Sequence, residues 1–516
     1  MTSASGPEGP PRPYGAAPHA GARPPGTRRG LAAAQNRALL DGPFPNAGLV
    51  RGISEGTLLL DRGGQVREAA FARIRETGAT VVRIPVDWRD AVSASPAPGF
   101  DARDPGSPEY HFADLDAAVR GAAAAGLTPL LVVSHAPAWA EAPGRWPDAY
   151  PGSWSPSPAA LEAFAAALAA RYSGRFPDPA AAGAALPKVR AFQAWNEPNL
   201  ARYLEPQWIV ENGRWRAFSP LAYRQLLNGF YAGVKSVAPG DTVVTAGVAP
   251  DGDPEGVGRM APVSFLRTLL CLSPAGDREP CPEPAHFDAL AFHPLSVENP
   301  DRPAPSSLDL AISDAAKLTG LLARARRLRT VLPAGPKPVW VTELNWESAP
   351  QAPGGVPPAE QAGWISRALH RLWVAGVSLV SWQFLIDPYP GARAGTPTGG
   401  LVEYQRPAGL FSAGPGGEPA DARPKDFLRG FSFPFDPLRV DARHVRIWAL
   451  VSDPRLPVEL QRPGAGRSWL TFASLRSAPD GVVNVLLRLR GPLTLRLRAG
   501  ALESAPESVG RRPAKF

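Results

Sequence analysis

The sequence predicts an α/β fold, a (β/α)8 barrel of parallel strands, followed by a small antiparallel β-sandwich. Three observations support this prediction. From about residue 43 to 430, short β-branched runs alternate with alanine-rich amphipathic segments, which is the pattern of a parallel α/β fold. These runs are apolar nearly throughout, as strands buried on both faces must be. From residue 431 onward the helical pattern fades, and runs with a period of two follow.

Each predicted barrel strand is a short apolar run that precedes an amphipathic segment. Leu161, Phe164, Leu168 and Tyr172 show the helical spacing of such a segment, and Gly376 ends another. Eight alternations over roughly 390 residues fit a barrel with long loops. A doubly wound open sheet is the alternative, but no Gly-x-Gly-x-x-Gly motif follows the first strand. The predicted strands are 48–53, 80–86, 128–134, 188–194, 242–248, 287–292, 338–342 and 378–385.

The two ends of the chain differ from its middle. Residues 1–42 are rich in proline, glycine and arginine, which predicts a disordered leader before the barrel domain of residues 43–430. Residues 431–516 are expected to form the sandwich as an accessory domain. Leucine and arginine alternate within two of its runs, which puts one side chain inward and the next in water. The strands predicted there are 446–451, 469–475, 482–490 and 493–498.

Positive charge is concentrated in the last segment. The chain has a net charge of +8, and from Phe433 onward 14 lysines and arginines stand against 7 acidic residues. Such a surface favours an acidic polymer of the cell envelope as a partner, and we expect no nucleic acid. The alternative is an arginine-rich surface set by the coding bias of a GC-rich genome. With 44% apolar and 20% charged residues, the chain is not one that is disordered throughout.

The chain has only two cysteines, Cys271 and Cys281, separated by a loop that contains proline and glycine. Their even number and close spacing predict one disulfide in an exported protein, with two unrelated thiols as the alternative. The sequence has no Cys-x-x-Cys motif, no His-Glu-x-x-His motif and only 7 histidines. We therefore expect no metal site and no cofactor.

The predicted location is extracellular or in the cell envelope. The disulfide favours export, but residues 1–29 contain no apolar segment typical of a signal peptide, so a cytoplasmic enzyme is the alternative. No stretch reaches the roughly 18 apolar residues that a membrane span needs. We expect a monomer with no integral membrane segment.

Two glutamates stand at the ends of the fourth and seventh predicted strands. Strand four ends in Trp-Asn-Glu-Pro-Asn, which contains Glu197, and strand seven ends in Trp-Val-Thr-Glu, which contains Glu343. In such a barrel the carboxyl ends of the strands meet at one mouth, where catalytic side chains lie. Hydrolysis of a glycosidic bond needs a carboxylic acid and a carboxylate, which a retaining enzyme holds about 5–5.5 Å apart. Arg83, at the end of strand two, can keep one of them ionised.

These two motifs resemble those of the clan A glycoside hydrolases, which are TIM barrels, particularly families 39 and 5, the cellulase-like group. The resemblance covers about residues 45–430. It implies that Glu197 is the acid/base, that Asn196 binds the sugar 2-hydroxyl, and that Glu343 is the nucleophile.

Three further positions match the same pattern. The resemblance makes Arg83 the strand-two arginine, His293 the strand-six histidine in Phe-His-Pro, and Trp382 the tryptophan beneath the sugar. One position departs from it. Families of this kind usually have a tyrosine near the histidine that bonds the nucleophile, and here Leu295 stands in its place. This departure leaves a catalytically inactive, glycan-binding barrel as an alternative.

Aromatic residues near the predicted strand ends suggest a groove for sugar rings. Trp88, Trp139 and Trp346 follow strands two, three and seven, and we expect them to contact substrate together with His135. Packing in the core is the alternative for the tryptophans. Ser134 and His135 do not form a serine triad, because adjacent strand residues point to opposite faces.

The sequence therefore predicts a retaining hydrolase that cleaves β-glycosidic bonds of an oligo- or polysaccharide by double displacement. Structural ion pairs at a barrel mouth are the alternative explanation of the two glutamates. A second alternative function, from another class of protein, is a cell-envelope scaffold whose basic sandwich docks to an acidic polymer.

Overall fold

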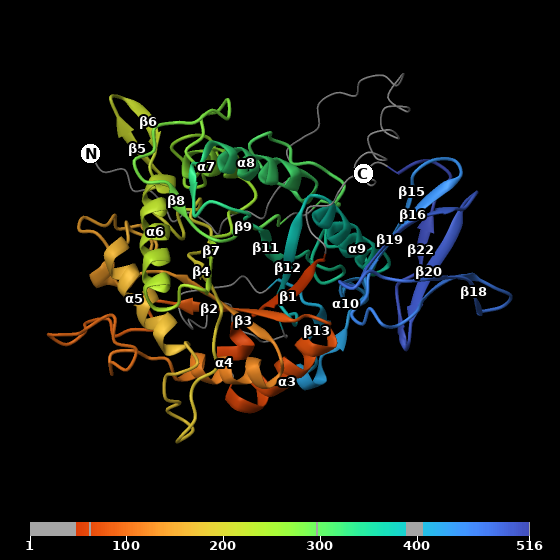
Figure 1. Ribbon diagram of the computed structural model, residues 1–516, viewed down its shortest axis with the longest axis horizontal. Helices are drawn as coiled ribbons and strands as arrows, with labels where there is room; N and C mark the ends of the chain where they lie inside the picture. The colour runs from red at the N-terminus through yellow and green to blue at the C-terminus, as the bar shows by residue number, and fades with distance from the viewer. Residues whose placement is uncertain (1–47, 61–62, 296–297, 389–405, 515–516) are drawn as a thin grey trace, which may run out of the picture.

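The computed structural model describes residues 48–60, 63–295, 298–388 and 406–514. The predicted leader, residues 1–42, lies outside the described residues. Eight parallel strands form one sheet in the order β7-β4-β3-β2-β1-β12-β11-β9 (Figure 1). The strands are β1 (Val50–Ser54), β2 (Val81–Asp87), β3 (Thr128–Ser134), β4 (Ala191–Ala194), β7 (Thr242–Thr245), β9 (Leu290–Phe292), β11 (Val339–Leu344) and β12 (Val377–Gln383).

The sheet closes on itself between its first and last strands. Parallel bridges join Val244 to Ala289 and Val248 to Phe292. The amide of His293 donates to the carbonyl of Val248 at 3.0 Å, beside β9. The prediction of an eight-stranded parallel barrel is therefore confirmed, and each predicted barrel run overlaps one of the observed strands.

Helices surround the barrel, and local sequence explains where several of them begin. In α5 the Ser157 hydroxyl accepts from the Ala160 amide at 3.3 Å, and Pro158 follows at the first helical position. Leu161, Phe164 and Leu168 of this helix are buried, as the helical spacing predicts. The helices are α2 (Thr57–Leu60), α3 (Gly63–Glu76), α4 (Ala113–Ala124), α5 (Pro158–Arg171), α6 (Ser219–Val237), α7 (Pro262–Leu269), α8 (Ala315–Leu328), α9 (Pro358–Val374) and α10 (Asp426–Ser432).

The barrel interior changes in character along its axis. Near the amino ends of the strands it is filled by small and aliphatic residues, including Leu130, Ala191 and Val244. In β2 and β4, the buried side chains that point into the barrel nearer the carboxyl ends are Arg83 and Gln193. Because side chains alternate along a strand, these polar groups also face the barrel interior, and they lie nearer the carboxyl ends of the strands. The polar end of the barrel is the end that carries the candidate site.

The C-terminal residues form two antiparallel sheets that face each other, as predicted for the sandwich. One sheet has the order β15-β16-β19, and the other has the order β18-β17-β20-β21, with β22 paired to β20. Val445, Ile447, Leu460, Leu495 and Leu497 fill the space between them. The strands are β15 (Phe435–Arg439), β16 (His444–Leu450), β17 (Val458–Pro463), β18 (Trp469–Leu475), β19 (Val482–Arg488), β20 (Leu493–Ala499), β21 (Leu502–Glu503) and β22 (Glu507–Val509).

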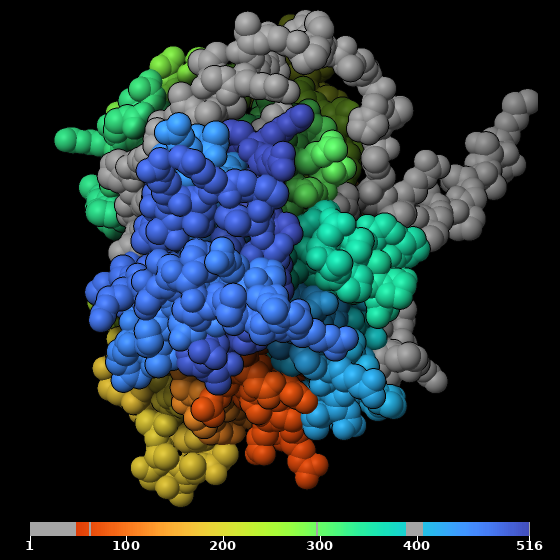
Figure 2. All heavy atoms as spheres, turned by 90° about the vertical axis from the view of Figure 1, so that its right-hand side faces the viewer, coloured from red at the N-terminus to blue at the C-terminus, as the bar shows by residue number. Residues whose placement is uncertain are grey.

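The sandwich is joined to the barrel by buried charges. Asp436 of β15 accepts from Arg367 of α9 at 2.7 Å and lies 2.6 Å from Nδ1 of His370 in the same helix. Burial opposes ionisation of Asp436, but Arg367 and His370 outweigh it and lower its pKa to about 2. The ring of Trp448 stacks on His370 at 4.7 Å. The sandwich occupies one side of the molecule, shown in blue in Figure 2.

A second contact ties the first barrel strand to the join between the domains. Arg51 of β1 donates to the carbonyls of Phe431 and Ser432 and to the hydroxyl of Ser452. Complete burial of this guanidinium lowers its pKa to about 10.

Two further predictions concern the whole chain. Cys271 and Cys281, after α7, are joined in a disulfide, as expected. Among the described residues, no helix combines the length and apolar character that crossing a bilayer requires.

The Asp436 contacts predict a pH-dependent stability. Replacement Asp436→Asn removes the nearer of the two carboxylates paired with Arg367, the other being Asp301 at 3.2 Å, and should lower the free energy of unfolding by about 2 kcal/mol at pH 6. Because the pKa of Asp436 is depressed, the contribution of its charge is present above pH 4 and is lost as the pH falls towards 2. The difference between wild type and variant in urea unfolding should therefore shrink over that range.

Asp453→Asn, which removes an exposed carboxylate paired with Arg455, is the control and should change little. A gap that is equally large at pH 6 and pH 2.5 would contradict the assignment.

Candidate active site

The two predicted glutamates meet at the mouth of the barrel. Glu197 follows β4, Glu343 lies within β11, and both are buried. One carboxylate oxygen of each lies within 4.8 Å of the other, and a nitrogen of His293 lies within the same distance of both. Nδ1 of His293 is 2.9 Å from Oε1 of Glu197 and 3.7 Å from Oε2 of Glu343.

The guanidinium of Arg83 donates hydrogen bonds from all three of its nitrogens. Nη1 donates to Oε1 of Glu343 at 2.6 Å and to the Ser54 hydroxyl at 3.0 Å. Nη2 donates to Oδ1 of Asn196 at 2.7 Å, and Nε donates to Oε1 of Gln193 at 2.7 Å. A buried charge is tolerated only when it is paired and hydrogen-bonded, and here both conditions are met. Arg83 thus holds Glu343 and Asn196 in place together.

The contact with Arg83 also sets the direction of a hydrogen-bond chain. Because a guanidinium can only donate, Gln193 must present its oxygen to Arg83 and its NH2 group to the other side. That NH2 group donates to the Thr342 hydroxyl at 3.1 Å. Thr342 Oγ1 lies 2.9 Å from Nε2 of His293. This chain favours the His293 tautomer whose proton is on Nδ1, which faces Glu197.

Gly247 leaves the space that His293 occupies. A Cβ atom on Gly247 would lie 2.1 Å from Nε2 of the imidazole, which no real side chain tolerates. The carbonyl of Gly247 also accepts from the amide of Glu197 at 3.1 Å. One residue without a side chain therefore positions both the histidine and the glutamate.

The backbone around Glu197 is strained. Trp195 has φ of 77° and Glu197 has φ of 35°, values in the left-handed region that favours glycine. Asn199 fixes the turn that follows, because its side chain bonds the amide of Ala249 at 2.9 Å and the carbonyl of Met260 at 3.0 Å. Asn199 is fully buried, so the last residue of the Trp-Asn-Glu-Pro-Asn motif supports the site from behind.

The tryptophans expected to line a groove differ in exposure. Trp88, Trp346 and Trp382 are buried. The indole nitrogen of Trp382 donates to the carbonyl of Ala408 at 2.9 Å, and that of Trp346 donates to the carbonyl of Glu298 at 3.2 Å. Trp139 is 38% exposed and packs edge-on against Trp88 at 5.9 Å. Of these four, Trp139 offers the largest surface to a ligand, and contact of any of them with substrate remains a prediction.

His135 lies at the end of β3, away from the two glutamates in its contacts. Its Nδ1 is 3.2 Å from Oδ2 of Asp87, and its ring packs against Tyr203 at 5.2 Å. The Ser134 hydroxyl also lies 3.2 Å from this nitrogen, so the expectation that Ser134 and His135 point to opposite faces is wrong, because His135 has left the extended conformation of the strand. The residue is buried, and its φ of 53° is again left-handed. His135 therefore belongs to the mouth of the barrel through Asp87 and Tyr203.

Sequence reasoning missed four polar residues of this site: Ser54, Gln193, Asp251 and Thr342. Alternation along β4 could have revealed Gln193, since Ala191 at the adjacent inward position is buried in the barrel interior. Asp251 lies after β7, where burial raises its pKa to about 6, and the nearby carboxylates of Asp309, Asp253 and Glu197 add to the effect. No periodic signal marks Asp251, because it lies in a loop.

Glu197, His293 and Glu343 form the one group among the described residues that is spaced to hold a metal ion. The Nη1 atom of Arg83 already supplies a positive charge 2.6 Å from Glu343, and a cation between the three ligands would be repelled by it. The donor set therefore suits ion pairing better than metal binding.

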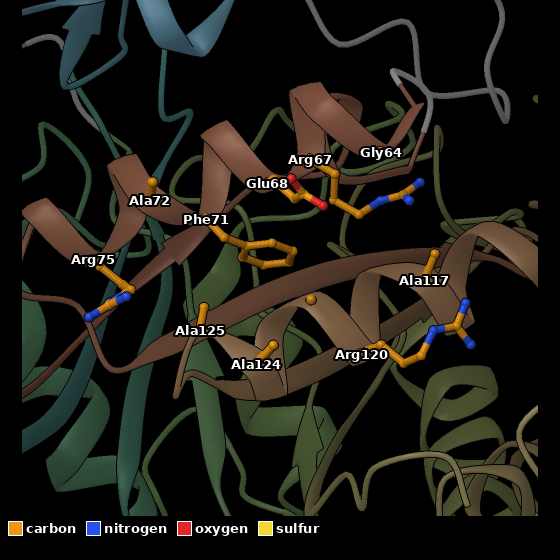
Figure 3. Close-up of a pocket in the computed structure, with 11 residues that line it drawn as sticks. Gly64, Arg67, Glu68, Phe71, Ala72, Arg75, Ala117, Arg120, Ala124 and Ala125 are labelled. Atoms are coloured by element: carbon orange, nitrogen blue, oxygen red, sulfur yellow. The ribbon is translucent and has the colours of Figure 1, made fainter. Parts of the chain in front are cut away.

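A cavity of about 420 Å³ lies elsewhere, between α3 and α4 on the outside of the barrel. Figure 3 shows Phe71 in this space, with Arg67, Arg75 and Arg120 around it. It shares no residue with the group around Glu197 and Glu343.

Comparison with known proteins adds a likeness in fold. No protein-family model matches the chain, and no curated protein matches it in sequence. Among solved structures, a family 39 glycoside hydrolase from Bacteroides cellulosilyticus WH2 is 16% identical, with a TM-score of 0.48, over 86% of this chain and 79% of that one. The chain has the architecture of a TIM barrel.

Two other solved structures are similar to a comparable extent. A monomeric β-xylosidase from Caulobacter crescentus CB15 is 13% identical, with a TM-score of 0.47, over 87% of this chain and 95% of that one. The endoglucanase Cel5A from Thermotoga maritima is 16% identical, with a TM-score of 0.37, over 68% of this chain and 92% of that one. The function of this chain therefore has to be inferred from its own side chains.

The space beneath His293 gives a test of the site geometry. Gly247→Ala should push the imidazole off Thr342 and Glu197 and lower the free energy of unfolding by about 2 kcal/mol, as overpacking does. Urea unfolding and a crystal structure of the variant measure both effects. Gly240→Ala is the matched control, because a Cβ atom there meets nothing within 4 Å. Two variants of equal stability, with His293 unmoved, would show the description to be wrong.

Proposed function

We propose that this chain is a retaining β-glycoside hydrolase in which Glu343 is the nucleophile and Glu197 is the acid/base. The observation that carries the proposal is the pair of buried carboxylates with oxygens within 4.8 Å of each other at a barrel mouth. Retaining enzymes hold such groups about 5–5.5 Å apart, whereas inverting enzymes leave about 6.5–9.5 Å for a water molecule.

The different partners of the two carboxylates support different roles. Glu343 bonds directly to the guanidinium of Arg83, which favours the ionised form that a nucleophile needs. Within the part of the chain that the structure describes, no arginine or lysine is paired with Glu197, and the carboxylate of Glu343 lies within 4.8 Å of it. Nδ1 of His293, at 2.9 Å, orients Glu197. A group that must give up a proton and later take one back suits these surroundings.

The reaction then proceeds in two steps. First, a carboxylate oxygen of Glu343 attacks the anomeric carbon while the bond from that carbon to the leaving oxygen breaks, and Glu197 gives that oxygen its proton. Next, the ionised Glu197 takes a proton from water, the water oxygen attacks the anomeric carbon, and the bond to Glu343 breaks. The anomeric configuration is inverted twice and is thus retained.

Asn196 is proposed to bind the hydroxyl next to the anomeric carbon. Arg83 donates to the side-chain oxygen of Asn196 at 2.7 Å, so the NH2 group of this amide can donate to a sugar hydroxyl. At the position where a tyrosine was expected, Leu295 offers no hydroxyl. Arg83, and Nδ1 of His293 at 3.7 Å, are the polar neighbours of Glu343 instead. Stabilisation of the nucleophile would then depend on charge more than on a phenol.

The disulfide between Cys271 and Cys281 supports a place outside the cytoplasm, in the extracellular space or the cell envelope. We propose a monomer that acts on a carbohydrate substrate. Because the sandwich has an excess of arginine, we propose an acidic polymer of the cell envelope as a partner of that domain.

Substitution of each glutamate separates the two roles. Glu343→Gln should reduce turnover of every aryl glycoside below detection, because no bond to the anomeric carbon can form. Glu197→Gln should lower turnover about 10³-fold for poor leaving groups but much less in the first step for a dinitrophenolate, which needs no proton. Steady-state and burst kinetics on a panel of aryl β-glycosides measure this, and NMR of the first product shows its anomeric form.

The outcomes distinguish the alternatives. A first product with inverted configuration would exclude the retaining mechanism. Comparable activity of wild type and Glu343→Gln would exclude Glu343 as the nucleophile. A wild-type protein that binds glycans but turns over none of the panel would favour the inactive glycan-binding barrel.

A further inference from the structure

The loop after β3 and the segment after β4 are joined edge to edge beside the mouth of the barrel. The amide of Glu205 donates to the carbonyl of Ser153 at 2.8 Å, and the amide of Ser155 donates to the carbonyl of Glu205 at 2.7 Å. The amide of Ala136, directly after His135, donates to the carbonyl of Gly152 at 2.9 Å. The two segments therefore form one continuous wall that starts at the end of β3.

This wall carries two aromatic rings that are about half exposed. Trp146 is 48% exposed and Tyr150 is 51% exposed. Trp146 packs against Trp154 with ring centroids 4.7 Å apart, and Trp154 is itself buried. The inner side of Trp146 is thus supported, and the rest of the indole is left to solvent. A supported, half-exposed tryptophan is the surface on which the C–H face of a sugar ring packs.

Polar groups lie next to these rings. The half-buried carboxyl of Glu205 accepts from the Ser153 hydroxyl at 3.5 Å and from the backbone amide of Tyr150. Burial raises the pKa of Glu205 to about 7, and the carboxylate of Asp148 adds to this. Glu141 accepts from the amide of Trp154 at 2.9 Å. The wall has three carboxyls, Glu141, Asp148 and Glu205, and two arginines, Arg145 and Arg202. It therefore has no excess of positive charge that would favour a uronic acid over a neutral sugar.

The wall is continuous with the catalytic pair through the backbone after β4. Glu205 follows Glu197 by eight residues. Between them, the carbonyl of Tyr203 accepts from the indole of Trp195 at 2.8 Å, and the ring of Tyr203 packs against His135. His135 and Tyr203 are themselves buried, so the rings of this wall that are open to a glycan are Trp146 and Tyr150.

We propose that Trp146, with Glu205 and Asp148 beside it, forms a further sugar subsite, and that the substrate is an oligosaccharide of neutral sugars that extends beyond the bond being cleaved. The inference rests on the proposed glycosidase function. A pyranose ring stacks on Trp146, and its hydroxyls donate to the two carboxylates. Substrate length and charge are thereby determined outside the catalytic group.

Binding to the full-length Glu343→Gln protein tests the subsite without turnover. Isothermal titration with neutral cello-, xylo- and manno-oligosaccharides of two to five units gives the dissociation constants. Adding Trp146→Ala should raise the Kd of the best ligand about fivefold. Trp215→Ala is the matched control, because Trp215 is 46% exposed in the same segment but lies on the hairpin β5 (Trp208–Glu211) and β6 (Arg214–Ala217). Glu205→Gln and its control Glu211→Gln form a second pair with the same expected contrast.

Each outcome supports or overturns the proposal. A Kd raised by Trp146→Ala and unchanged by Trp215→Ala supports it. Equal values in both variants overturn it, and so does the absence of binding by every oligosaccharide. Hydrolysis of single-sugar aryl glycosides by the wild type reports on the proposed function separately, since such substrates have no second sugar ring to occupy the proposed subsite. Active enzyme with unaffected oligosaccharide binding in Trp146→Ala would reject the subsite alone.

Discussion

A single guanidinium buried inside the barrel organises the site. Arg83 arises from the second strand and is almost inaccessible to water, so its charge has to be matched by groups that are equally buried. Glu343 neutralises the charge, while Ser54, Gln193 and Asn196 each accept a further hydrogen bond from the guanidinium. These partners come from β1 (Ser54), from β11 (Glu343), and from β4 and the turn after it (Gln193 and Asn196). Removing the arginine would therefore leave several acceptors unpaired at once, and not merely one carboxylate.

The hydrogen bonds of Arg83 also bear on Glu197, through the residues that lie between them. Because Arg83 determines which end of the Gln193 amide faces it, the direction of the bonds through Thr342 to His293 follows, and His293 contacts Glu197. One cation therefore bears on both carboxylates, directly on Glu343 and through neutral groups on Glu197. Charge and geometry are supplied by the barrel interior, while the strained turn at Trp195 and Glu197 supplies the approach to solvent.

Much of this arrangement was predictable from the sequence. The barrel strands are runs with a clear composition, and the rule that strand ends meet at one mouth was enough to bring Glu197, Glu343, Arg83 and His293 together. The rule gives no information on which side of a tryptophan faces water. Trp88, Trp346 and Trp382 follow strands as expected, yet they are packed beneath the mouth. Both a core and a sugar groove demand a large apolar ring, so composition alone does not separate them.

The sandwich shows a different limit of sequence analysis. The sequence predicted β16, β18, β19 and β20, but it missed β15 and β17, which contain Pro437 and Pro463; proline usually argues against a strand. β15 is an edge strand, where a missing amide proton is tolerated. Asp436, one residue before Pro437, is the group that binds Arg367 and His370, so an edge strand with an unfavourable sequence makes the main contact between the domains.

That contact has a consequence for how the protein can be divided. A chain ended after α10 would keep Arg367 and His370 of α9 but lose their carboxylate, and it would expose the face of His370 that Trp448 covers. Arg51 of the first strand would lose its bond to Ser452 as well. The sandwich is consequently not an exchangeable cassette, and grafting it onto another barrel would require transplanting the helix that receives it.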